Sequence, residues 1–187
     1  MKGVQKIYLI ESIIWDVINL RYAGIKKFDI ENGLGIGLTL FTQKCSKNCL
    51  GCHNPNTHSA TGGFEFTDDT LNEMTSFFEN NPQVKRFTAS GGDPLESLDL
   101  CELILPILKT KFPYLKIWIY TGFTFEYLIQ NNQYEKVLGY CDVLVDGKFE
   151  INNRKPNLHY KGSSNQRIID VQKSLKENKV VLFELNI

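Results

Sequence analysis

Segments typical of strands and of helices alternate along most of this chain, and this alternation limits the fold more than any other feature. The expected strands cover residues 34–42, 84–89, 115–121, 142–146 and 180–185. The expected helices cover residues 67–80, 98–112, 125–131 and 166–176, with Pro106 kinking or breaking the second. Such alternation predicts parallel βαβ units and an α/β fold. About five or six units are too few for a closed eight-stranded barrel of about 250 residues, so we expect an open, partial (β/α) barrel with a mostly parallel sheet.

The composition predicts an ordinary folded protein without a strong net charge. Of its 187 residues, 42% are hydrophobic and 22% are charged, which is close to the usage of globular domains. The 21 basic and 21 acidic side chains cancel. Without a long-range positive field to collect phosphates, sequence-independent binding of nucleic acid is disfavoured.

The N-terminal part is apolar but is not expected to enter a membrane. Residues 7–20 are interrupted by Glu11, Asp16 and Asn19, are too short to span a bilayer and lack the pattern of a signal peptide. We expect residues 1–27 to form an extension packed on the core, with the main domain at residues 28–187. The odd number of cysteines, five, favours a reducing cytoplasm over a disulfide framework.

Three cysteines lie within eight residues, directly after the first expected strand. They are Cys45, Cys49 and Cys52, with the spacing Cys-x3-Cys-x2-Cys. A structural zinc site or an electron-transfer 4Fe-4S cluster uses four protein ligands. Three thiolates on a four-iron cube would instead leave one iron open to another ligand. Two alternatives stay open: zinc bound by these thiols together with His53 or His58, and three unrelated cysteines, which the polar character of the loop disfavours.

A glycine-rich turn follows the second expected strand. The sequence Ser-Gly-Gly-Asp-Pro at residues 90–94 offers backbone without side chains, where a ligand could approach the main chain, and Asp93 adds a carboxylate. Alone, this sequence would be an ordinary turn between a strand and a helix. Thr121 and Asp146 end two later strands, and the carboxyl ends of parallel strands gather reactive residues at one edge of a sheet.

Together, these patterns resemble the radical S-adenosylmethionine superfamily, in which CxxxCxxC follows one strand and a Gly-Gly-acid turn follows a later one. From about residue 28 to residue 173 the chain resembles the anaerobic ribonucleotide reductase activating proteins in particular. The segments that carry this resemblance are residues 32–35, 52–54, 90–95, 117–122, 142–149 and 162–167. The resemblance implies a partial barrel of the radical SAM type at residues 28–187.

The resemblance implies an activase that cleaves S-adenosylmethionine reductively at a 4Fe-4S cluster and forms a glycyl radical on the large subunit of anaerobic ribonucleotide reductase. It implies that Cys45, Cys49 and Cys52 bind the cluster and are the catalytic residues. A flavodoxin-like protein or another one-electron donor would reduce the cluster. The candidate cofactor-binding residues are Gly51, Cys52, His53, Ser90, Gly91, Gly92, Asp93, Thr121 and Asp146.

The chain departs from the family pattern at four positions. Gly37 stands in place of an arginine, Lys44 in place of a glycine, His53 in place of a tyrosine and His58 in place of a tryptophan. None of these is a cluster ligand, but two alternatives stay open. The chain could activate another glycyl-radical enzyme or act on a small substrate, or it could be a non-catalytic zinc module or Fe–S electron carrier. The absence of a second cysteine group favours the ribonucleotide reductase type.

Overall fold

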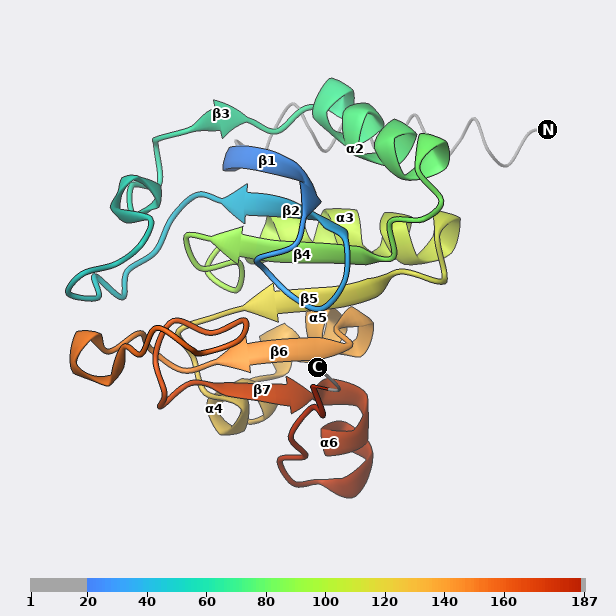
Figure 1. Cartoon of the computed structure of the whole chain (residues 1–187). Helices are drawn as coiled ribbons and strands as arrows, with labels where there is room; N and C mark the ends of the chain where they lie inside the picture. Colours follow the sequence, from blue (N-terminus) through green and yellow to red (C-terminus); the bar gives the residue numbers. More distant parts are fainter. Residues whose placement is uncertain (1–19, 186–187) are drawn as a thin grey trace.

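A seven-stranded sheet forms the centre of the structure, which is a computed structural model that describes residues 20–185 (Figure 1). The strands lie in the order β3-β1-β2-β4-β5-β6-β7. Their bounds are Arg21–Asp29 (β1), Gly37–Thr42 (β2), Phe64–Glu65 (β3), Arg86–Gly91 (β4), Lys116–Tyr120 (β5), Val143–Asp146 (β6) and Arg167–Asp170 (β7). Strands β2, β4, β5 and β6 pair in parallel, whereas β1 pairs antiparallel with β2 and β3, and β7 pairs antiparallel with β6. The α/β class is confirmed, but the sheet is mixed and only its centre is parallel.

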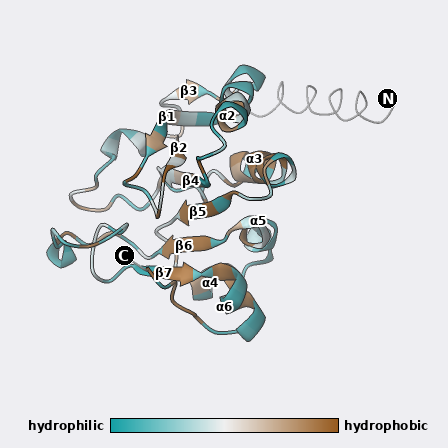
Figure 2. Cartoon of the chain, turned by 45° about the vertical axis from the view of Figure 1, so that its right-hand side comes forward, coloured by the Kyte–Doolittle hydropathy of each residue, from teal (hydrophilic) through white to brown (hydrophobic). Residues whose placement is uncertain are grey.

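The helices lie along one face of this sheet (Figure 2). They are α2 (Asp68–Asn80), α3 (Leu98–Lys111), α4 (Phe125–Ile129), α5 (Glu135–Tyr140) and α6 (Val171–Glu177), with short 3-10 turns at Pro55–Thr57, Asn132–Tyr134 and Ile151–Asn153. Of the kink or break expected at Pro106, the break is wrong, because α3 continues through this residue. One side of α3 is buried on the sheet, including Leu100, Ile104 and Leu108. This burial outweighs the cost of about 3 kcal/mol for a proline inside a helix.

The two faces of the sheet are covered differently. In β5, Ile117 and Ile119 point to the helices and join the main core. We call this side of the sheet the helix face. The alternate side chain Trp118 points to the opposite face, where it packs with Val143, Val145 and Ile168, and we call this the loop face. It is covered by side chains from loops and from the C-terminal segment. Within residues 20–185, the sheet thus has one helical layer and one irregular cover.

The secondary structure differs from the expectations at several places. Strands β1 and β3 and helix α5 were not expected, and the helix expected at residues 166–176 is strand β7 followed by α6. The Asp170 side chain begins α6 by accepting a hydrogen bond from the Lys173 N–H, which separates the two elements. The strand expected at residues 180–185 is reduced to a single bridge between Ile169 and Leu182.

The N-terminal prediction concerns residues that lie mostly outside the described part. Residues 7–19 of the apolar run are not described, and β1 runs across residue 27, where we expected the extension to end. The division at this residue therefore stays a prediction. Among residues 20–185, no helix combines the length and the apolar character needed to cross a bilayer.

Candidate active site

The three clustered cysteines lie on the loop that follows β2, which we call the cysteine loop (residues 43–54). This loop and the loop after β6 extend from the edge of the sheet toward which the parallel strands point (Figure 1). Cys45, Cys49 and Cys52 are half-buried free thiols. The loop turns tightly, because the Cys52 N–H donates to the Cys49 carbonyl at 3.1 Å and because Asn48 and Gly51 have positive φ angles of 45° and 72°.

The beginning of the cysteine loop is anchored by the segment that follows it. The buried Gln43 amide donates to the carbonyls of Asn56 at 3.0 Å and Ser59 at 2.7 Å. The Cys45 N–H donates to the His58 carbonyl at 3.1 Å. The backbone of residues 56–59 thus folds back against the first cysteine. His53 is exposed and His58 is partly buried, so the two histidines of the zinc alternative have different surroundings.

The three thiols fit an iron–sulfur cluster by chemical type, because thiolates are the usual ligands of such clusters. Burial, with smaller contributions from nearby Asp93, Glu96 and Cys49, raises the pKa of Cys45 to about 11, although a hydrogen bond from the Lys47 N–H opposes this rise. Within residues 20–185, no three Cys, His, Asp or Glu side chains converge closely enough to hold a single metal ion. The fit therefore rests on the number and type of donors on this loop.

The glycine turn after β4 packs directly on the start of the cysteine loop. The N–H of Gly92 donates to the Thr42 carbonyl at 2.9 Å, and the N–H of Asp93 donates to the Lys44 carbonyl at 2.8 Å. A Cβ atom on Gly91, whose φ is +98°, would lie 2.7 Å from Phe41 Cα, and one on Gly92 would lie 2.5 Å from the Lys44 oxygen. Both glycines are thus required where the chain approaches itself.

The Asp93 carboxylate is used inside the protein. It is 1% exposed, its Oδ1 accepts hydrogen bonds from the Leu95 N–H at 3.1 Å and the Thr121 hydroxyl at 2.8 Å, and its Oδ2 accepts from the Gly122 N–H at 2.9 Å. Burial raises its pKa, although these bonds and the charge of Lys47 oppose the shift. Asp93 and Thr121 therefore join the ends of β4 and β5. Ser90 is buried at this turn, and its carbonyl accepts a hydrogen bond from the Thr42 hydroxyl at 3.3 Å.

The Asp146 carboxylate is also hydrogen-bonded within the protein. Its side chain is on the helix face, where Oδ2 accepts the N–H of Phe125 at 2.8 Å and Oδ1 accepts Arg167 Nε at 3.0 Å. The Arg167 guanidinium continues to Glu126 with two bonds of 2.8 and 2.7 Å. Asp146 therefore connects β6 to α4 and β7. A direct contact of Asp146 or Thr121 with the cofactor stays a prediction.

Sequence reasoning missed several residues that support the cysteine loop. Glu96 and Phe123 bind Lys47, which lies between the first two cysteines. Ile151 packs against Gly51, where a Cβ atom would lie 2.6 Å from its Cδ1. Only Glu96 had a signal, since it follows the Gly-Gly-Asp turn closely in the sequence. Phe123 and Ile151 come from loops whose positions depend on the fold.

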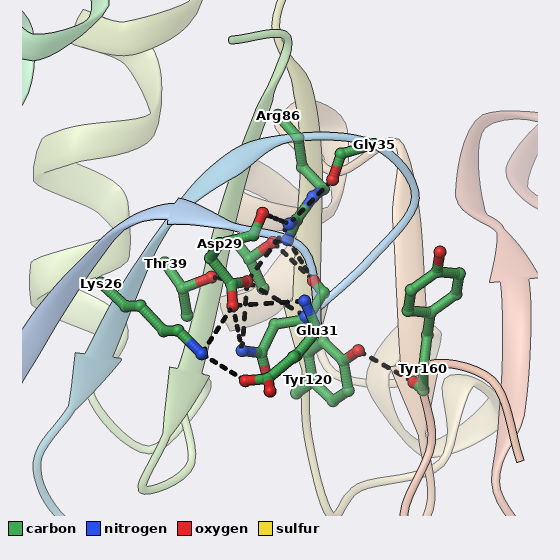
Figure 3. Close-up of polar contacts among 10 residues, drawn as sticks. Lys26, Asp29, Glu31, Gly35, Thr39, Arg86, Tyr120 and Tyr160 are labelled. Carbon is green, nitrogen blue, oxygen red and sulfur yellow. Dashed lines mark hydrogen bonds and ion pairs between the residues drawn. The ribbon is translucent and has the colours of Figure 1, made fainter.

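Arg86 explains the glycine found where the family pattern has an arginine. In the β2–β4 register Gly37 is the partner of Arg86, and a Cβ atom on Gly37 would lie 2.7 Å from Arg86 Cζ. The guanidinium of Arg86 binds the carboxylate of buried Asp29 at 3.2 Å and the carbonyls of Asn32 and Gly35 (Figure 3). The neighbouring strand thus supplies an arginine that fixes the loop between β1 and β2.

Comparison with known proteins identifies the family. A family model described as a 4Fe-4S single cluster domain matches residues 31–169, which include the three cysteines and the glycine turn. The anaerobic ribonucleoside-triphosphate reductase-activating protein of Vibrio cholerae is 34% identical over 153 residues, covering 80% of this chain and 97% of the relative. Those of Enterobacteria phage T4 and Haemophilus influenzae are 35% and 37% identical over 151 and 145 residues, covering 80% and 75% of this chain and 93% and 91% of the relatives. The chain therefore belongs to the family of anaerobic ribonucleoside-triphosphate reductase-activating proteins.

Proposed function

We propose that this chain activates an anaerobic ribonucleotide reductase by generating a glycyl radical on its large subunit. The observation that carries the proposal is the packing of the cysteine loop against the glycine turn, in a chain of the activating-protein family. The parallel centre of the sheet supports an open, partial barrel of the radical SAM type. A flavodoxin-like or other one-electron donor and a cytoplasmic location rest on the sequence resemblance.

Cys45, Cys49 and Cys52 would hold a 4Fe-4S cluster, and the main chain of residues 90–93 would meet S-adenosylmethionine. When bound, these cofactors would supply reductive cleavage of the sulfonium and a 5′-deoxyadenosyl radical that takes a hydrogen atom from a glycine Cα of the reductase. Residues of the chain supply the positioning. Asp93 fixes the glycine turn from inside, and Gly92 allows the turn to approach the cysteine loop closely.

The proposal is tested by anaerobic reconstitution with iron and sulfide, followed by reduction and addition of S-adenosylmethionine. We expect 5′-deoxyadenosine from the wild type and none above background from Cys49→Ala, because that variant lacks one of three cluster ligands. Addition of the reductase large subunit should produce a glycyl radical signal in electron paramagnetic resonance.

Three results would favour the alternatives. A reducible cluster that never cleaves S-adenosylmethionine, with or without the reductase, would indicate an electron carrier. Cleavage without a radical on the reductase would indicate another protein or small-molecule substrate. A wild type that binds zinc and forms no cluster would exclude both radical functions.

A further inference from the structure

One carboxylate collects three donors from the cysteine loop. Glu96, just before α3, accepts the Lys47 ammonium at 2.9 Å and the Ser46 hydroxyl at 2.8 Å on Oε1, and the Ser46 N–H at 2.8 Å on Oε2. The side chains of Lys47 and Glu96 are only 18% and 10% exposed. Salt bridges on open surfaces contribute little, but hydrogen-bonded charges shielded from water fix geometry more strongly.

The carboxylate remains charged in this environment. Burial alone would raise the pKa of Glu96, but the hydrogen bonds from Lys47 and Ser46 and the charge of Lys47 outweigh burial, so that the pKa is lowered. Glu96 therefore stays an acceptor for all three donors at neutral pH. The contact between the cysteine loop and the start of α3 is thus made to an ionised carboxylate.

The other side of Lys47 is also packed. Its Nζ lies 3.3 Å from the centroid of the Phe123 ring, a close cation–π contact. Its aliphatic stem covers Gly122, where a Cβ atom would lie 2.9 Å from Lys47 Cγ. The N–H of this same glycine donates to Asp93. The cysteine loop and the glycine turn therefore meet at the end of β5.

The position of Lys47 in the motif makes this packing relevant to the cluster. Lys47 lies two residues after Cys45 and two residues before Cys49, so fixing it limits the positions of both thiols. We propose that Glu96 and Lys47 form a clamp that holds Cys45 and Cys49 in the arrangement that accepts the cluster, an inference that rests on the proposed function. Both are positioning residues, since neither is a ligand.

The test compares Glu96→Gln, Lys47→Met and their double variant in the full chain. The matched control is the Glu102–Lys136 pair, with N–O distance 3.0 Å, which joins α3 and α5 and is more exposed, at 32% and 55%. After anaerobic reconstitution, we expect each single variant to lose iron to a chelator about 10-fold faster than the wild type, the scale of support residues around metal ligands. The double variant should be no faster than the singles, because the two residues act together. Glu102→Gln and Lys136→Met should match the wild type.

A second measurement does not need the cluster. In the iron-free chain, a thiol reagent should modify the most reactive cysteines faster in Glu96→Gln and Lys47→Met than in the wild type and the control pair.

Folded variants with wild-type iron retention and thiol reactivity would overturn the clamp, while cleavage of S-adenosylmethionine by the wild type would leave the proposed function intact. A wild type that takes up no cluster would instead reject the proposed function, and thiol reactivity would still decide whether the clamp exists. Should circular dichroism show that Glu96→Gln is unfolded, Lys47→Met alone decides, because it retains most of the aliphatic stem.

Discussion

At the residue scale, the polar contacts of Asp29 show how a buried charge is accommodated. Asp29 is 0% exposed, and its Oδ2 accepts the Thr39 hydroxyl at 2.8 Å and the Asn32 N–H at 3.0 Å beside the Arg86 guanidinium (Figure 3). Burial alone would raise the pKa of Asp29, but the hydrogen bonds from Thr39, Asn32 and the Glu31 N–H outweigh it and lower the pKa to about 2. Because the ionised form is favoured in the folded state, Asp29 links stability to pH.

This linkage predicts a specific loss of stability in acid. A carboxylate whose pKa is lower in the folded than in the unfolded chain stabilises the fold above its unfolded pKa of about 4, and this contribution is lost as pH falls toward the folded value. Between pH 5 and pH 2, the free energy of unfolding should therefore fall by about 2 kcal/mol more in the wild type than in Asp29→Asn. Urea unfolding across this pH range measures the difference.

The control for this prediction is Asp68→Asn, which changes an exposed carboxylate in the first turn of α2. This variant keeps Asp29 and should retain the additional acid sensitivity of the wild type. If the free energy of unfolding changed with pH in the same way in the wild type and in Asp29→Asn, the contacts of Asp29 would not lower its pKa in the folded state.

At the element scale, the ends of β2 and β4 leave no space for a side chain at Gly91. The alanine methyl of Gly91→Ala would meet Phe41 at 2.7 Å, and the φ of +98° is strained for any L-residue. We expect Gly91→Ala to lower the free energy of unfolding by about 2–4 kcal/mol, the sum of backbone strain and overpacking. Gly139→Ala in α5 is the control, because nothing lies within 4 Å of an added Cβ, and it should stabilise the chain by up to about 1 kcal/mol. Thermal unfolding compares the two, and an equal effect of both substitutions would contradict the packing described.

The central strands could be predicted from the sequence, but the outer ones could not. Strands β4, β5 and β6 are short apolar runs between turn residues, whereas β1 is only partly buried and depends on pairing with β2. Strand β7 was assigned to a helix, because its apolar residues run directly into α6. Strand β7 runs antiparallel to β6, and the local sequence does not encode this pairing.

The same limit applies to the site. The sequence predicted that loops at the carboxyl ends of the parallel strands gather at one edge of the sheet, and the cysteine loop and the glycine turn are in contact there. The sequence did not predict that the carboxylates of Asp93 and Asp146 would be used inside the fold. The direction of a side chain at the end of a strand depends on the register of the sheet, and a shift of one residue would move it to the other face.

At the scale of the whole molecule, the described part of the chain covers the loop face with a few aromatic contacts. The ring centroids of Tyr160 and Phe183 lie 5.8 and 5.5 Å from that of Trp118, both in edge-to-face geometry. Phe183 is held there by its N–H, which donates to the Ile168 carbonyl at 2.8 Å. The C-terminal segment therefore shields the indole of Trp118, which is 1% exposed at the centre of this face.

Removal of the Phe183 ring should destabilise the loop face more than removal of the adjacent Leu182 side chain. We expect Phe183→Ala to lower the free energy of unfolding by about 1–2 kcal/mol, since the half-buried ring loses apolar burial and its contact with Trp118. Leu182→Ala, which changes the adjacent residue with 60% exposure, should have less than half of this effect. In a Trp15→Phe background Trp118 is the remaining one of the two tryptophans, so its fluorescence reports on the loop face alone. The emission of Trp118 should shift to longer wavelength in Phe183→Ala and stay unchanged in Leu182→Ala, because only the first substitution admits water to the indole. The same emission in both variants would mean that the C-terminal segment does not shield the loop face in solution.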